Sequence, residues 1–358
     1  MDTDRLFNVH IRSETPLVSP AEIKADLPLA PDREEFVLTA RGKVRAILER
    51  SDPRLLILVG PCSIHNTESG LEYARRLKAL EKEVGDALVP VMRVYFEKPR
   101  TTVGWKGLIN DPRLDGSFRI DEGLRLARRF LLDIAALDLP AGTEALDPVV
   151  PQYIGDLVAW TAIGARTSES QTHRELASGL SSPVGFKNTT DGNMELAINA
   201  IQAAGQPHHF LGITQKGRIA VFRTRGNPHA HIILRGGLRP NYDRASLAYC
   251  REKLRAAGLP PNIVVDCSHG NSEKNHERQS AVFQDCLRQI EDGNRDLIGL
   301  MLESHLLAGA RPGFAPGEND VPADQSITDA CLDWDATRAL LLDAAARMRP
   351  LLAARGAS

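Results

Sequence analysis

Eight short apolar segments of this sequence each end beside a residue that could do chemistry. We interpret the segments as strands at Leu55–Gly60, Pro90–Tyr95, Pro140–Glu144, Trp160–Ala165, Pro183–Phe186, His231–Leu234, Ile263–Val265 and Ile298–Leu302. The residues at or just past their ends are Cys62, Arg93 with Lys98, Glu144, Arg166, Lys187, Arg235, Asp266 with His269, and Glu303. Because all strands of a parallel barrel open their carboxyl ends on one face, these side chains are predicted to share one pocket.

Positive charges form the first group of candidates. A single lysine or arginine would be read as a solvated surface residue, but six at one barrel mouth would not. They are Arg93, Lys98, Arg100, Arg166, Lys187 and Arg235. Arginine matches phosphate and carboxylate groups with two parallel hydrogen bonds, whereas lysine acts as a point charge. Since a phosphate ester carries about −1.5 to −2 charges at neutral pH, the set indicates two phosphorylated substrates, one of which also bears a carboxylate.

Metal-type ligands form the second group, namely Cys62, His269, Glu303 and Asp329. A thiolate, an imidazole and two carboxylates make a mixed soft and hard set that suits a divalent transition metal. The spacing is too long for a zinc finger, and the sequence has no CxxC motif. Taken alone, Cys62 would be an inert buried thiol and Asp329 a helix cap. Their shared place at the predicted mouth favours a metal site.

Lys187 has a second interpretation. A lysine at a barrel strand end is where a Schiff-base aldolase keeps its nucleophile, once burial and neighbouring cations depress its pKa. Such an enzyme would not need four metal-type ligands. Six further residues are interpreted as structural or exposed: His65, His173, His208, His229, His276 and Cys267.

The elements that must position these residues alternate between strands and amphipathic helices, which is typical of a (β/α)8 barrel. Asn66, Asp121 and Asp243 are predicted to cap helices, and Gly258 is predicted to follow the end of one. Each of these helices has one apolar face, as an outer ring of helices requires.

Two parts of the chain do not follow this alternation. Residues 1–50 are predicted to form an N-terminal arm and a helix near Glu34–Arg50 outside the barrel, and residues 51–358 to form the catalytic barrel. Within the barrel, His209–Thr214 and Arg218–Thr224 predict a β-hairpin at about 208–226, inserted between the fifth and sixth barrel strands. The arm and the hairpin are predicted to serve regulation or oligomerisation.

Composition narrows the function classes. The 358 residues carry a formal net charge of −2, which argues against a nucleic-acid-binding protein. No apolar run approaches the length of a membrane span, and no signal peptide is recognised. Five cysteines in no regular framework indicate a reducing compartment, so we expect a soluble cytoplasmic protein.

At these residues the chain resembles the class I, microbial, aromatic-amino-acid-sensitive 3-deoxy-D-arabino-heptulosonate 7-phosphate (DAHP) synthases. The resemblance covers nearly the whole chain, and the block after the second strand is its most specific part. It is carried by Gly60-Pro61-Cys62-Ser63-Ile64-His65, Arg93, Lys98-Pro99-Arg100-Thr101-Thr102, Gly104-Trp105-Lys106-Gly107, Ile163-Gly164-Ala165-Arg166, Gly185-Phe186-Lys187-Asn188, Leu234-Arg235-Gly236-Gly237, Asp266-Cys267-Ser268-His269-Gly270-Asn271 and Thr328-Asp329-Ala330-Cys331. One departure is Thr189, where relatives carry glycine.

The resemblance implies a transferase that condenses phosphoenolpyruvate, erythrose 4-phosphate and water into DAHP and phosphate, the first step of the shikimate pathway. It implies one divalent metal ion (Mn, Fe, Co or Zn) held by Cys62, His269, Glu303 and Asp329. Phosphoenolpyruvate would be bound by Arg93, Lys98, Glu144, Arg166, Lys187 and Arg235, and erythrose 4-phosphate by Lys98, Arg100, Thr101 and Asp329. The resemblance does not decide which group activates the attacking water. The candidates are Lys98, Glu144, His269 and a metal-bound water.

The resemblance also implies a feedback site for an aromatic amino acid, and a homodimer or homotetramer. The matching effector positions are Asn8, Pro151, Gln152, Leu180, Ser181, Gly212 and Phe222. Gly212 stands where phenylalanine-sensitive relatives tend to have serine, which would leave room for a phenol hydroxyl and favours tyrosine. The alternative is that Gly212 only eases the backbone of the hairpin.

Three other functions compete with this one. An octulosonate-phosphate synthase that uses arabinose 5-phosphate is disfavoured by Lys98-Pro99-Arg100-Thr101 and by the added arm and hairpin. The second is the metal-free Schiff-base aldolase built on Lys187. A catalytically inactive regulatory barrel is the third, and the complete set of four ligands and six cations argues against it.

Overall fold

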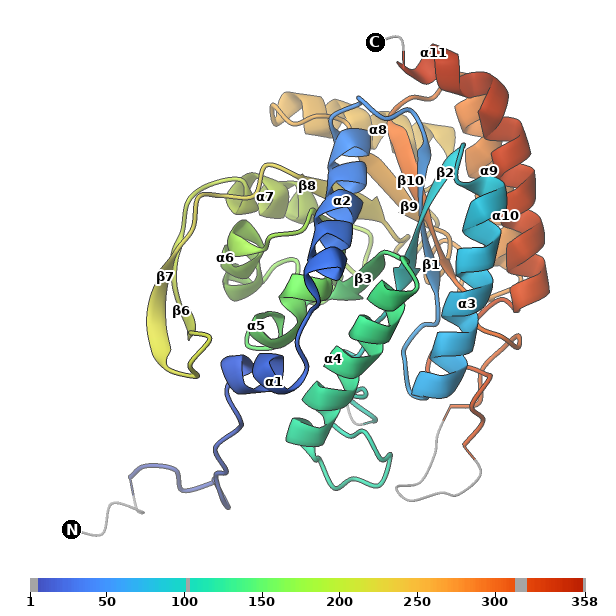
Figure 1. The fold of residues 1–358 in the computed structure, drawn as a ribbon. Helices are drawn as coiled ribbons and strands as arrows, with labels where there is room; N and C mark the ends of the chain where they lie inside the picture. The colour runs from blue at the N-terminus through green and yellow to red at the C-terminus, as the bar shows by residue number, and fades with distance from the viewer. Residues whose placement is uncertain (1–5, 101–103, 313–320, 357–358) are drawn as a thin grey trace.

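Eight parallel strands close into a barrel in the computed structural model, which describes residues 6–100, 104–312 and 321–356 (Figure 1). Around the barrel the order is β1, β2, β3, β4, β5, β8, β9 and β10. The strands are β1 Leu55–Gly60, β2 Leu88–Arg93, β3 Ala141–Glu144, β4 Trp160–Ile163, β5 Val184–Lys187, β8 Ala230–Leu234, β9 Ile263–Asp266 and β10 Leu297–Glu303. The predicted (β/α)8 fold is confirmed.

Several strand boundaries differ from the prediction by one or two residues. β2 begins at Leu88, which pairs with Leu55, so Pro90 lies inside the strand and does not begin it. At the other end, polar residues that we had placed after apolar runs, such as Lys187 and Asp266, are the last residues of their strands. The reason is that backbone pairing ends a strand, whereas the prediction followed apolar side chains.

Helices follow the strands and form the outer layer (Figure 1). The main ones are α3 Thr67–Val84, α4 Ile120–Ala136, α6 Gln171–Gly179, α7 Glu195–Ala204, α8 Arg244–Ala256, α9 Arg278–Glu291 and α10 Trp334–Met348. Shorter turns of helix are α5 Pro151–Ile154, η2 Gly155–Leu157, η3 Arg349–Leu351 and α11 Leu352–Gly356. Asn66 and Asp243 cap α3 and α8 as predicted. The cap predicted at Asp121 is wrong, because α4 already begins at Ile120 and Asp121 lies in its first turn, where its negative charge interacts favourably with the helix dipole.

The N-terminal helices have different roles. α2 (Pro31–Leu48) belongs to the barrel core, because Val44, Ile47 and Leu48 join the same buried cluster as interior side chains such as Trp160. α1 (Pro20–Asp26) was not predicted, and its Ala21 N–H donates to the carbonyl of Gln215 in the hairpin turn. Part of the predicted extension is therefore integral to the barrel.

The hairpin consists of β6 (His209–Ile213) and β7 (Ile219–Arg223) and lies between β5 and β8 in the chain, as predicted. It contacts α6 and stands to one side of the barrel (Figure 1). On one face Phe210 and Phe222 stack, with ring centroids 5.7 Å apart. The other face exposes large apolar side chains, namely Leu211, Ile219 and Val221.

Among the described residues, no helix combines the length and the apolar character needed to cross a membrane. The cytoplasmic location stays a prediction.

Candidate active site

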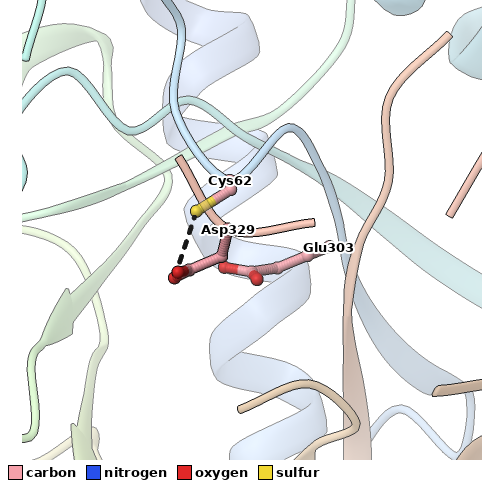
Figure 2. Close-up of side chains that lie close together, drawn as sticks. All are labelled: Cys62, Glu303 and Asp329. Carbon is pink, nitrogen blue, oxygen red and sulfur yellow. Dashed lines mark hydrogen bonds between the residues drawn. The ribbon is translucent and has the colours of Figure 1, made fainter. Parts of the chain in front are cut away.

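Three of the four predicted metal ligands converge at the carboxyl end of the barrel (Figure 2). Donor atoms of Cys62, Glu303 and Asp329 all lie within 4.8 Å of one another. Cys62 comes just after β1, Glu303 is the last residue of β10, and Asp329 lies in the loop between β10 and α10. The Cys62 thiol donates to the Asp329 carboxylate, with Sγ and Oδ2 3.6 Å apart.

His269 completes the set. Its Nε2 lies 3.8 Å from Glu303 Oε1 and 3.8 Å from Asp329 Oδ2. The other ring nitrogen, Nδ1, faces Asp266 Oδ2 at 3.1 Å and Ser268 Oγ at 2.6 Å. A carboxylate behind a histidine fixes its tautomer and turns its free nitrogen toward a metal. A soft thiol, an imidazole and two carboxylates at these distances fit a divalent transition metal ion.

The hydrogen bonds that hold Glu303 in place could not be predicted from the sequence. The amide of Gln279 makes two hydrogen bonds to the backbone of Glu303, from Nε2 to the carbonyl oxygen at 3.0 Å and from the Glu303 N–H to Oε1 at 2.9 Å. The side chain of Glu303 accepts from Arg93 Nη2 at 3.1 Å. These contacts hold the carboxylate in place, and the position of Gln279 on α9 gave no sequence signal.

Lys187 is ion-paired to Asp266, with Nζ and Oδ2 2.8 Å apart. Burial opposes ionisation of Asp266, but Lys187 and then His269 hold its pKa well below the usual range. The ion pair occupies the Lys187 amine, whereas a Schiff-base nucleophile must be free to attack a carbonyl. The geometry therefore argues against the aldolase interpretation.

A cavity of about 250 Å³ adjoins the metal-type ligands. It is lined by five of the six predicted cations, namely Lys98, Arg100, Arg166, Lys187 and Arg235. Arg93, the sixth, does not line it, because it is buried below the mouth with its guanidinium 4.0 Å from the centre of the Tyr95 ring. Thr101 lies outside the described residues.

Lys98 is the cation that lies nearest the ligands. Its Nζ donates to the carbonyl of Cys62 at 3.1 Å and lies 3.1 Å from Cys62 Sγ. Burial alone would lower the pKa of Lys98, but Cys62 and then Glu303 raise it above its ordinary value. The ammonium is therefore held at the junction between the predicted metal and substrate sites.

Two of the cavity-wall residues that the sequence analysis missed can carry a charge. Lys274 and His276 line the cavity, although His276 had been interpreted as structural or exposed. Both come from the loop between β9 and α9, in which the backbone of His269, Glu273 and Lys274 has positive φ. Left-handed backbone at residues other than glycine is uncommon, and it is often found at functional sites. Sequence periodicity carries no signal for it.

The sequence analysis also missed the buried carboxyl group of Glu97. It is almost fully buried, and its Oε1 accepts from the backbone N–H of Asp147 at 3.3 Å. Burial raises the pKa of Glu97 to about 8, and the carboxylate of Asp147 adds to the shift. Glu97 thus connects two loops, the loop after β2, which also contains Lys98, and the loop after β3.

A larger cavity, of about 990 Å³, lies between α2, α5, α6 and the hairpin. Five of the seven predicted effector positions line it: Pro151, Gln152, Leu180, Ser181 and Phe222. Asn8 is exposed and does not line it, and neither does Gly212. Glu144 lines both this cavity and the smaller one, so the two share a wall.

Gly212 nonetheless acts on this wall. The backbone of Gly212 is not left-handed, and a Cβ built there would lie 3.1 Å from two ring atoms of Phe222. Added bulk at Gly212 must therefore displace a ring that lines the cavity. Because the backbone is not left-handed, conformational strain does not require glycine here, and the effector role of Gly212 stays a prediction.

Comparison with known sequences gives one family. The sequence model of the DAHP synthetase I family matches residues 30–342. The chain is 55% identical over 341 residues to the Tyr-sensitive phospho-2-dehydro-3-deoxyheptonate aldolase of Escherichia coli, covering 95% of this chain and 96% of the relative. It is 51% identical over 334 residues to the Phe-sensitive enzyme of the same organism, covering 93% and 95%.

Comparison with solved structures agrees. A phospho-2-dehydro-3-deoxyheptonate aldolase from Francisella tularensis is 44% identical and superposes with a TM-score of 0.92. The match covers 95% of this chain and 98% of that one.

Proposed function

The chain belongs to the DAHP synthetase I family and catalyses the DAHP synthase reaction, and from that premise we propose how its residues divide the work. The reaction joins phosphoenolpyruvate to erythrose 4-phosphate, consumes water and releases phosphate. The observation that carries the proposal is that the cation-lined cavity adjoins the metal-type ligands and shares Glu303 and Asp329 with them.

Phosphoenolpyruvate is assigned to the side of the cavity formed by the ends of β4, β5 and β8. Arg166, Lys187 and Arg235 line it there and provide the charges that a phosphate and a carboxylate need. Arg93 extends this positive field from below and contacts Glu303. Glu144 lies on the same wall.

Erythrose 4-phosphate is assigned to the side formed by the loop after β2. Arg100 lines the cavity there, and Thr101 is proposed to act with it. Asp329 borders the same space, and Lys98 lies between the two substrate positions. Holding both substrates by their phosphates fixes their separation, which converts a bimolecular step into an oriented one.

The proposed metal ligands are Cys62, His269, Glu303 and Asp329, and the ion would be Mn, Fe, Co or Zn. When bound, the metal supplies Lewis-acid polarisation of the erythrose 4-phosphate aldehyde for attack by the enol carbon of phosphoenolpyruvate. Lys98 and the arginines stabilise the negative charge that moves onto the leaving phosphate.

The proton of the attacking water needs an acceptor. Glu144 Oε1 is buried and has no hydrogen-bond partner among the described residues. His269 already directs Nδ1 to Asp266 and Nε2 to the ligand carboxylates. We therefore assign proton acceptance to Glu144 and metal binding to His269, and Lys98 keeps its place as the cation between the two substrates.

The test is phosphate release from phosphoenolpyruvate in the presence of erythrose 4-phosphate. Wild-type protein should release phosphate only when both the sugar phosphate and the metal are present, and a chelator should stop it. Cys62→Ala should abolish both the release and the binding of metal. The matched control Cys250→Ala removes another buried thiol, which lies on α8 and does not line the cavity, and it should retain both. Full activity in Cys62→Ala would refute the ligand assignment.

A Schiff-base mechanism predicts a different result for the chelator. If that mechanism operated, chelation would leave the activity unchanged, and borohydride would trap a covalent adduct of substrate with Lys187. We expect no adduct, because Lys187 is paired with Asp266.

Feedback inhibition is assigned to the larger cavity, with tyrosine as the effector. The support is the cavity itself, the close approach of Gly212 to Phe222, and the higher identity to the Tyr-sensitive relative than to the Phe-sensitive one. Ser181→Phe should fill the cavity, weaken inhibition by tyrosine and leave uninhibited turnover intact.

Assembly is assigned to the exposed apolar surfaces, and we propose a homodimer or homotetramer. The outer face of the hairpin exposes Leu211, Ile219 and Val221. The N-terminal segment exposes a second group, namely Leu6, Phe7, Val9 and Ile11. Apolar groups gathered on one surface favour burial against a second copy of the chain.

A further inference from the structure

Asp329 differs from the other proposed ligands in how it is held. Cys62 is fully buried beside a strand end, and the side chain of Glu303 is 2% exposed. The side chain of Asp329 is 62% exposed and belongs to a loop. A ligand on a loop contributes to metal affinity only as far as other contacts fix that loop.

One buried hydrogen bond joins the loop of Asp329 to the loop of Cys62. Ser63 follows Cys62, Thr328 precedes Asp329, and the two hydroxyl oxygens lie 2.9 Å apart. Both residues are buried, with exposed fractions of 1% and 7%. This pair links the neighbours of two ligands whose own donor atoms are 3.6 Å apart.

A second anchor lies on the other side of Asp329. The backbone N–H of Leu332 donates to the carbonyl oxygen of Glu303 at 2.9 Å. Asp329 therefore lies between a contact to the segment of Cys62 and a contact to the segment of Glu303, and Cys331 pairs with Gly309 between them. Of the two, the Ser63–Thr328 contact is made by side chains and can be removed without changing the backbone.

We propose that Ser63 and Thr328 are positioning residues that set the separation of Cys62 and Asp329 and thereby the affinity for the metal ion. The inference rests on the metal site proposed above. With the hydrogen bond present, the four ligands are arranged before the metal arrives. Without it, the direct hydrogen bond between Cys62 and Asp329 loses a neighbouring support, and more of the ordering of the fourth ligand must take place when the metal binds.

The experiment titrates metal-free protein with Co²⁺ and follows the thiolate-to-cobalt absorption, which reports binding without reference to turnover. Ser63→Ala and Thr328→Val should each weaken Co²⁺ binding by about 10-fold, the lower end of the range for such supporting contacts. The double variant should lose no more than either single variant, because both remove the same bond. Thr328→Ser keeps the hydroxyl and should bind like wild type.

The matched control is Thr161→Val, which removes the hydroxyl of another buried pair, Thr161 and Ser182, whose oxygens are 2.7 Å apart on β4 and before β5. Its Co²⁺ affinity should equal that of wild type. Denaturation of the metal-free variants separates the two roles. A purely structural role would lower their stability and leave the affinity unchanged, and this result would overturn the proposal.

Cys62→Ala distinguishes failure of the inference from failure of the proposed site. If Cys62→Ala keeps the thiolate-to-cobalt absorption of wild type, Cys62 is not a ligand, the metal site itself is wrong and the inference falls with it. If Cys62→Ala loses that absorption while Ser63→Ala and Thr328→Val bind Co²⁺ normally, only the positioning role is wrong. Should Thr328→Val not fold, Ser63→Ala and Thr328→Ser decide the question.

Discussion

Arg93 donates to the Glu303 carboxylate over 3.1 Å, and both side chains are almost completely buried. Arg93 was expected to bind substrate and Glu303 to bind metal, so this contact joins the two halves of the site. The pair places the cation below the cavity and orients the carboxylate toward the other ligands. The two functions predicted for the barrel mouth are therefore physically coupled.

We predict that Arg93→Met destabilises the metal-free protein by about 3–5 kcal/mol, because it leaves Glu303 buried without its partner. Metal should recover part of this loss, since the ion supplies a new positive partner for the carboxylate. Denaturation with and without Mn²⁺ measures both effects. The control Arg128→Met breaks the ion pair of Arg128 with Asp156, away from the ligands, and should gain no more from Mn²⁺ than wild type does. An equal response of the two variants would contradict the coupling.

Gly212→Ser should raise the tyrosine concentration needed for half-inhibition by roughly tenfold, a cost within the 1–3 kcal/mol range of overpacking. The new Cβ presses on Phe222, which lines the effector cavity. Inhibition by phenylalanine should suffer less, because its ring carries no hydroxyl. Inhibition curves for both amino acids provide the measurement. Gly42→Ser makes the same change where a Cβ meets nothing within 4 Å, and it should behave like wild type.

Val221→Asp should dissociate the proposed oligomer, because it puts a charge into the exposed apolar face of the hairpin. Light scattering coupled to size exclusion gives the mass in solution. Leu238→Asp places the same charge at a still more exposed apolar residue outside the hairpin and the N-terminal segment, and it should leave the mass unchanged. A wild-type mass of a single chain would refute the assembly proposal.

Stability should fall as the pH drops from about 6.5 to about 4, in part because of His231. Its Nε2 accepts from Trp160 Nε1 at 3.1 Å inside the barrel, so the ring is neutral. Burial lowers the pKa of His231 to about 4, below the ordinary 6.5. In this window the unfolded chain binds the proton and the folded chain does not, so His231 stabilises the fold fully above about pH 6.5 and contributes up to about 3 kcal/mol less by pH 4.

Denaturation at a series of pH values measures this slope. His231→Gln can still accept from Trp160 but cannot titrate, so the slope should become shallower. It should not vanish, because other buried groups also titrate. An unchanged slope would show that His231 is not the source.

Much of the site could be predicted because strand ends recur at a regular place in a parallel barrel. Cys62, Glu144, Lys187 and Glu303 follow or end apolar strands, so the sequence predicted both their chemical types and their common place at the barrel mouth. Asp329 ends no strand, and it was grouped with the ligands because it lies in the loop beyond the eighth strand. Gln279 and Glu97 gave no signal, because a helix face or a loop position does not reveal which backbone it will meet.

The sequence by itself determined the alternation of strands and helices, and with it the set of chemical groups at the barrel mouth, because apolar periodicity and strand ends are local properties. Only the tertiary structure decided how these groups divide. It placed Arg93 below the cavity, paired Lys187 with Asp266, and joined the neighbours of Cys62 and Asp329 through Ser63 and Thr328. Those contacts join residues far apart in the chain, and barrel closure and loop packing, not local sequence, set their distances.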